Sequence, residues 1–202
     1  MAASCGEAVV SGISLVDSIC VLLIGLFTAM ASGGAVVAAQ YMGHGDKEMV
    51  GRASNQLFLA VGGVALLFMT IALIWNKGLL ALLYGNVEAD VMNAARIYFY
   101  IVAVSFPFLG IYNGGAALFR AVGDSKRPLY FLVFSACVNT VLDLVFVVKL
   151  HWGIAGVAWA TVIAQGLSAV LILVVLFRAN GAYRLVLSKM RTDRGALQEI
   201  VR

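Results

Sequence analysis

Long uninterrupted apolar segments limit how this sequence can fold more than any other feature does. The hydrocarbon core of a bilayer is about 30 Å thick, so a helix needs about 20 mostly apolar residues to cross it. About five segments pass this length test. They cover residues 13–42, 55–75, 92–119, 129–150 and 154–177. We therefore expect each of these segments to cross a membrane as a helix.

The charged residues are few and are grouped between these segments, where membrane boundaries are expected. Charged residues make up 12% of the chain and hydrophobic residues 62%, and the mean hydropathy is +0.98. Soluble domains are about a quarter charged. Transmembrane strands would alternate apolar and polar residues over about ten positions, whereas these segments are apolar on nearly all sides. The sequence thus predicts an all-α polytopic membrane protein, with a membrane domain over residues 1–178.

Basic residues are distributed unequally between the two sets of connectors. The connectors after the first, third and fifth segments hold Lys47, Arg52, Arg120, Lys126, Arg127, Arg178, Arg184, Lys189, Arg191, Arg194 and Arg202. The opposite side has fewer basic residues and adds acidic ones: Lys77, Arg96, Lys149, Glu7, Glu88 and Asp90. The positive-inside rule places the first set in the cytoplasm and the N-terminus outside the plasma (inner) membrane. The net charge of +4 then reflects topology, and we expect no binding to nucleic acid.

The final segment, residues 179–202, alternates basic residues with Leu185, Leu187, Met190 and Leu197 at roughly helical spacing. Such a pattern is typical of an amphipathic helix lying on a membrane surface. A solvated linker between two membrane domains has the same composition. Both interpretations make this segment a cytoplasmic connector, and both suggest that it is truncated.

Two connectors carry glycine-containing turns followed by helix-start signals. Gly43 to Glu48 combines glycine turn residues with Asp46, a capping residue type. Arg120 to Pro128 has Gly123 for the turn, capping candidates after it, and Pro128 where a helix can begin. We expect a tight turn and a capped helix start in each connector.

Taken with the spans, these residues resemble the multidrug and toxic compound extrusion (MATE) family of the multidrug, oligosaccharide and polysaccharide exporter superfamily. The resemblance covers nearly the whole chain and rests on the order and spacing of its features. These are Gly33-Gly34, Ala39-Gln40, Gly43 to Asp46, Pro107, Arg120, Gly123, Asp124, Pro128, Asn139, Asp143, Gly153 to Gly156, Thr161 and Gln165.

The resemblance implies a definite place for the chain within a larger fold. MATE transporters have twelve helices in two lobes of six, and this chain looks like helices two to six of the first lobe followed by the start of the connector between lobes. Its partners would then be the first helix and the second lobe of the parent transporter, besides the lipid bilayer. The predicted outside position of the N-terminus agrees with a preceding helix.

Asp143 is the clearest functional candidate, because a carboxylate within a span is costly and persists mainly when it is paired or used. Asn139 lies one helical turn away, and Thr161 lies on the following span. Together they offer carboxylate, amide and hydroxyl oxygens, which suit a hard cation. In the family, the matched positions form the cation-binding or protonation site of the first lobe, with a further Asp on the first helix. We expect a proton or sodium ion at Asp143 and no cofactor.

Structural explanations for the same residues stay open. Asn139 and Thr161 can form hydrogen bonds between helices, and Asp143 can be a neutral buried carboxyl group. Asp17, Gln40, Asn113 and Gln165 can line a substrate pathway or merely bind helices to one another. Asp17 in particular can attract a cationic compound if its span lines a central cleft.

Pro107 lies in the middle of the third segment and should kink its helix. A kink at this position can act as a hinge. Tyr98 and Phe108 near it can offer an aromatic wall to a planar cation, or can simply pack or face lipid.

The combined prediction is a secondary antiporter that exports amphipathic or cationic compounds, with proton or sodium influx as the driving force. A lipid-linked oligosaccharide flippase of the same superfamily and a non-transporting, truncated membrane scaffold are the alternatives. The flippase would be expected to need a more cationic central cavity than this sequence shows. Enzyme activity is not expected, because His44 and His151 lie in connectors and no nucleophile and base are paired within the spans.

Overall fold

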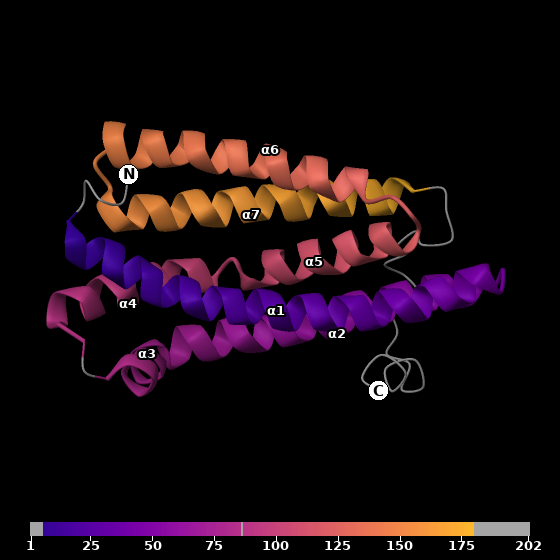
Figure 1. The fold of residues 1–202 in the computed structure, drawn as a ribbon, viewed down its shortest axis with the longest axis horizontal. Coiled ribbons are helices and arrows are strands. Elements are labelled where there is room, and N and C mark those ends of the chain that lie inside the picture. Colours follow the sequence, from indigo (N-terminus) through magenta and orange to yellow (C-terminus); the bar gives the residue numbers. More distant parts are fainter. Residues whose placement is uncertain (1–5, 86, 180–202) are drawn as a thin grey trace.

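The computed structural model describes residues 6–85 and 87–179, which form an elongated bundle of helices (Figure 1). The helices are α1 (Glu7–Gly43), α2 (Lys47–Ile74), α3 (Asn76–Tyr84), α4 (Ala89–Ala103), α5 (Phe106–Ala121), α6 (Lys126–Asp143), the π-helix η2 (Leu144–Lys149) and α7 (Gly153–Arg178). The predicted all-α fold is confirmed. Residues 180–202 of the predicted amphipathic connector lie outside the described residues.

The membrane-spanning character of the bundle agrees with the sequence. Four helical segments are long and apolar enough to cross a bilayer: α1, α2, α6 together with η2, and α7. The pair α4 and α5 passes the same test jointly as one span bent by 53°, which brings the total to five. The start of α1, α3 and the turn before α7 lie at one end of the bundle, and the α1–α2 and α5–α6 connections lie at the other (Figure 1).

Two helices begin at least six residues earlier than the apolar segments predicted. The first begins at Glu7 instead of residue 13, and the second begins at Lys47 instead of residue 55. The start of α2 has a clear cause: the side chain of Asp46 accepts hydrogen bonds from the backbone N–H groups of Glu48 and Met49, at 3.1 and 3.0 Å. A hydropathy window finds the part of a helix inside hydrocarbon, whereas polar caps decide where the helix ends. The predicted glycine turn and capped start are confirmed here, with Gly45 at a φ of 75°.

The short helix α3 was not predicted. With nine residues it is too short to cross a membrane, and it is held by side-chain bonds to other helices. The hydroxyl of Tyr84 donates to the carbonyl of Leu15 on α1 at 2.9 Å. The side-chain amide of Asn76 donates to the carbonyl of Arg96 on α4 at 3.4 Å. These bonds hold α3 against the end of the bundle.

The third predicted span, residues 92–119, is two helices instead of one kinked helix. The break at Val104 and Ser105 lies just before Pro107, which occupies the first turn of α5. A proline ring clashes with the carbonyl four residues earlier in a continuous helix, here that of Ala103, the last residue of α4. In the first turn of a new helix its missing N–H is no loss. Proline chemistry thus accounts for the position of the break.

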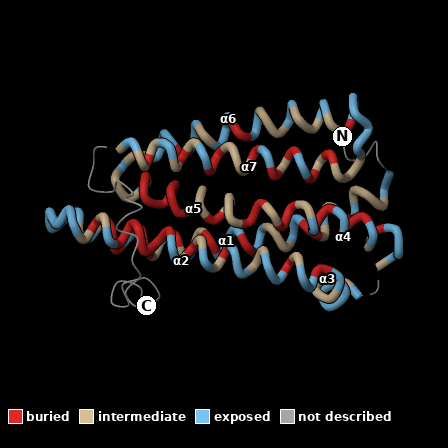
Figure 2. Tube along the Cα trace, turned by 180° about the vertical axis from the view of Figure 1, so that it is seen from behind, coloured by how far each residue is buried: buried red, intermediate tan, exposed pale blue. Residues whose placement is uncertain are grey.

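Close contacts between small residues hold the helices together. α1 packs against α2, α4 and α5, and α7 packs against α4, α5 and α6. A Cβ atom at Gly12 of α1 would lie 2.8 Å from the backbone nitrogen of Ala95 on α4, so these two backbones approach closely. Membrane helices associate through such contacts because lipid supplies no hydrophobic drive between them. Buried residues follow the inward sides of the helices, and α6 is largely exposed (Figure 2).

Gly12→Ala should destabilise the bundle, because the new methyl group has to displace the backbone of α4. Overpacking of this kind costs about 1–3 kcal/mol. Gly25→Ala in the same helix is the matched control, since nothing lies within 4 Å of its Cβ position. Thermal unfolding in detergent micelles should show a lower midpoint for Gly12→Ala and an unchanged or higher one for Gly25→Ala. Equal midpoints for the two variants would contradict the close approach.

Candidate ion-binding site

The site predicted at Asp143 lies where α6 and α7 pack side by side. The hydroxyl of Ser135 on α6 donates to the carbonyl of Ala164 on α7 at 2.5 Å, which fixes the two helices relative to each other. Asp143 is the last α-helical residue of α6, and the chain continues from it as the π-helix η2. Single turns of π-helix are rare and are found frequently at functional sites. The carboxyl group therefore lies at a change of helical geometry.

Several buried polar atoms on these two helices have no hydrogen-bond partner in the described part of the chain. They are Nδ2 of Asn139, Oδ1 of Asp143 and Oε1 of Gln165. A buried polar atom without a partner costs about 1–3 kcal/mol, and hydrocarbon supplies no water to satisfy it. Oδ1 of Asp143 and Oε1 of Gln165 are acceptors that a proton donor or a cation can satisfy, whereas Nδ2 of Asn139 is a donor that needs an acceptor.

Tyr98 of α4 connects this region to α1. Its side chain is 4% exposed, and its hydroxyl lies within hydrogen-bonding reach of the Thr161 hydroxyl and of the Asp17 carboxylate. The Thr161 hydroxyl also donates to the carbonyl of Val157 at 3.0 Å. The carboxylate of Asp143 is near enough to act electrostatically on Tyr98. Residues from α1, α4 and α7 therefore meet at one tyrosine hydroxyl, and the Asp143 carboxylate of α6 acts on it electrostatically.

The sequence did not assign Tyr98 to this cluster. Of the alternatives that the sequence left open for Tyr98, its burial agrees with packing and not with an aromatic wall or a lipid-facing position. A usable signal was present, because a buried tyrosine hydroxyl in a membrane span needs a polar partner. Asp17, predicted for a substrate pathway, is an exposed residue whose carboxylate lies within hydrogen-bonding reach of this hydroxyl. The structure thus connects a predicted pathway residue with the predicted ion site.

The other two pathway candidates lie elsewhere. Gln40 is exposed and lies 23 residues beyond Asp17 on α1, about 35 Å along a helix axis. Asn113 accepts a hydrogen bond from the Thr28 hydroxyl on α1 at 3.1 Å and donates to the carbonyl of Leu109 at 2.9 Å. Asn113 therefore binds α5 to α1, which is the structural alternative for this residue. A pathway role for either residue stays a prediction.

The chemistry of the cluster suits a proton or a hard cation. Asp143 supplies a carboxylate, Asn139 an amide carbonyl oxygen, and Thr161 and Tyr98 supply hydroxyl groups. Oxygen ligands of this kind bind alkali and alkaline-earth cations, and a carboxylate can take a proton at the same place. These groups are of the types that bind either species, and ion binding at Asp143 stays a prediction.

Comparison with known proteins decides the family. The family model MatE matches residues 1–145. The chain belongs to the MATE family. This confirms the resemblance that the connectors and the intramembrane polar residues indicated.

MATE relatives cover most of the chain at modest identity. The probable multidrug resistance protein YpnP of Bacillus subtilis is 29% identical over 163 residues, which are 81% of this chain and 35% of the relative. The probable multidrug resistance protein YoeA of the same organism is 31% identical over 183 residues, covering 86% of this chain and 38% of the relative. The chain thus spans little more than a third of the length of these MATE relatives.

Solved MATE structures share the fold. A MATE crystal structure in the bent conformation superposes with a TM-score of 0.90 at 20% identity, over 97% of this chain and 44% of that one. An outward-facing MATE transporter of the multidrug, oligosaccharide and polysaccharide superfamily gives 0.89, over 98% and 44%. The described helices therefore have the arrangement of less than half of a MATE transporter.

Two asparagines allow the structural and functional explanations to be separated. Asn113→Leu removes a bond between α1 and α5 and should lower the free energy of unfolding by about 1 kcal/mol. Asn139→Leu removes an amide nitrogen that has no partner, so the unfolding free energy should stay equal or rise. Unfolding of both variants by titration with a denaturing detergent measures the difference. A greater loss of stability for Asn139→Leu would assign that residue a structural role.

Proposed function

We propose that this chain is most of the first lobe of a secondary antiporter that exports amphipathic or cationic compounds, with proton or sodium influx as the driving force. The observation that carries the proposal is the group formed by Tyr98, Thr161 and Asp143, with Asn139 one turn before Asp143, in which buried polar atoms on α6 lack partners among the described residues. Membership of the MATE family and relatives named as multidrug resistance proteins support it.

Coupling requires the ion and the exported compound to favour different conformations. Asp143 is proposed to be the ion-responsive group, because its carboxylate changes charge when it gains a proton and changes its ligand when it binds sodium. The broken span of α4 and α5 is proposed to be the part that moves when the ion binds. Tyr98 on α4 belongs to the ion-site group, and the 53° break at Val104 and Ser105 follows it along the chain. Pro107 would maintain that hinge.

Asp17 is proposed to belong to the path of the compound. Asp17 is exposed, yet its carboxylate lies within hydrogen-bonding reach of the Tyr98 hydroxyl. The pair Asp17 and Tyr98 therefore connects the exposed surface of α1 with the ion site. Gln165 lies one turn beyond Thr161 on α7, with an unpartnered carbonyl oxygen. A two-lobed pathway would also need helices beyond those of this chain, because MATE structures are more than twice its length.

We further propose that the chain lies in the plasma (inner) membrane with the α1–α2 and α5–α6 connections in the cytoplasm. The support is the basic character of those connections, which hold Lys47, Arg52, Lys126 and Arg127. Ions moving down their gradient would then enter from the end at which α3 lies.

Asp143→Asn should abolish gradient-driven export while leaving the protein folded, because the amide is nearly isosteric but cannot take or release a proton. The substitution is made in the chromosomal gene, so that the protein is produced at its native length. Efflux of preloaded ethidium, a lipophilic cation, is measured with and without a protonophore or a sodium gradient. Asp90→Asn at the exposed start of α4 is the control and should export normally.

Loss of export in both aspartate variants would indicate a general effect of charge and not a site. Unchanged ethidium efflux in Asp143→Asn, with protein levels equal to those of the parent, would remove the proposed coupling role. Unchanged efflux in a strain that lacks the gene altogether would favour a membrane scaffold for this chain.

A further inference from the structure

A second concentration of polar groups lies away from the ion site, in a cavity of about 800 Å³ between the end of α2, α3 and α4. Its polar lining consists of Asn76, Lys77, Asn93 and Arg96. The α4 residues at positions 93, 96, 97, 100 and 101 follow the spacing of one helical face. The cavity therefore depends on α3, the helix that the sequence did not predict.

The cavity has a positive character. Lys77 and Arg96 line it, and none of its lining residues in the described part of the chain is a carboxylate. Neither cation forms an ion pair among the described residues. The Nε atom of Arg96 is buried and has no hydrogen-bond partner there. A buried guanidinium donor without an acceptor among the described residues would be stabilised by an anionic group in the cavity.

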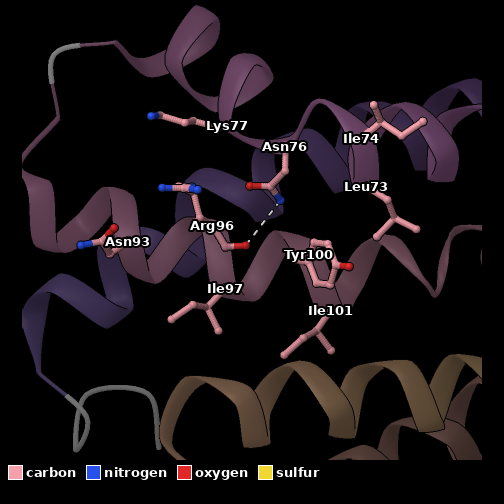
Figure 3. A pocket seen from close by; sticks show the side chains of 9 residues that line it. All are labelled: Leu73, Ile74, Asn76, Lys77, Asn93, Arg96, Ile97, Tyr100 and Ile101. Carbon is pink, nitrogen blue, oxygen red and sulfur yellow. Dashed lines mark hydrogen bonds between the residues drawn. The ribbon is translucent and has the colours of Figure 1, made fainter.

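The cavity is also divided into a polar and an apolar part. Figure 3 shows the nitrogen-bearing ends of Lys77, Arg96 and Asn93 toward one end, and Leu73, Ile74 and Ile101 toward the other. The apolar side opens to the outside of the bundle, where Ile74 is 82% exposed. A free inorganic anion would use only the first part. A molecule with an anionic head and an apolar tail would use both.

The position of the cavity is that of a membrane–water boundary. It lies at the end of the spanning helix α2, next to Trp75, which is 58% exposed, and Tyr100, which is 56% exposed. Tryptophan and tyrosine are enriched at the level of lipid headgroups. Long basic side chains near helix ends extend to the same level. The cavity therefore opens at the level of the bilayer where phospholipid headgroups lie.

We infer that this cavity binds the phosphate headgroup of a membrane phospholipid, in the leaflet at the α3 end of the bundle. Arg96 and Lys77 contact the phosphate, the side-chain amide of Asn93 lines the headgroup, and the first acyl methylenes lie along Ile74 and Ile101. Asn76 has a positioning role, because its amide donates to the Arg96 carbonyl at 3.4 Å and thereby fixes α3 over α4.

The test measures lipid binding to the full purified chain in detergent micelles by native mass spectrometry. Palmitoyl-oleoyl phosphatidylglycerol is the probe, and the diacylglycerol with the same acyl chains tests whether the phosphate is needed. Arg96→Gln and Lys77→Gln should each weaken binding of the phospholipid by about tenfold or more, since charge-assisted bonds to phosphate are among the strongest. Lys149→Gln is the matched control, because Lys149 is exposed at the same end of the bundle and does not line the cavity.

Each other outcome overturns the inference in a defined way. Equal binding of diacylglycerol would show an apolar groove without a phosphate site. Displacement of the lipid by millimolar inorganic phosphate would show a free-anion site. Equal loss in Lys149→Gln would show general attraction to anionic lipid, and a lipid-free dimer would show that a second copy covers the cavity. Thermal unfolding of each variant verifies the fold, and Lys77→Gln, on an exposed residue of α3, keeps the test valid if Arg96→Gln does not fold.

Discussion

The absence of water in the hydrocarbon core is the constraint on which this structure depends. Every backbone N–H and C=O group inside the bilayer needs a partner within the protein, so the spanning segments have to be helices. The span formed by α4 and α5 is broken beside Pro107, where a donor is already missing. Small residues such as Gly12 then bring the helices close enough for their side-chain hydrogen bonds to form.

The same constraint separates structural from functional polar residues. Ser135 and Asn113 have bonds to neighbouring helices and hold the bundle together. Asn139 and Asp143 have buried atoms without partners among the described residues, as does Arg96 in a different part of the molecule. Such exceptions destabilise a fold, and a ligand that binds them recovers the free energy. These atoms fall into two groups, an interior cluster suited to a cation and a peripheral cavity suited to an anion. Because the two groups lie apart, ion coupling and lipid binding would be separate properties of this chain.

Much of the fold followed from the sequence, because long apolar segments have few alternatives in a membrane. Asp143, Asn139 and Thr161 were also identifiable, since a polar residue within such a segment stands out. Three features were not predictable from composition and spacing. The helix α3 is too short for a hydropathy window, the π-helix after Asp143 leaves no mark in the sequence, and the role of Tyr98 depends on helix packing that brings α1, α4 and α7 together. The cavity lined by Lys77 and Arg96 was not predictable either, because these two residues line the same cavity only when α3 packs over α4.

The central claim is that the Asp143 carboxyl group carries a proton in one state of the site and loses it in another, when the coupling ion binds or the pH rises. Infrared difference spectroscopy of the purified chain tests it most directly, because a protonated carboxyl group has a C=O stretching band that disappears on ionisation. Addition of sodium at constant pH, or a step to higher pH, should remove such a band from the parent protein and not from Asp143→Asn. A band that changes equally in both proteins, or no band change in the parent under either condition, would contradict the account.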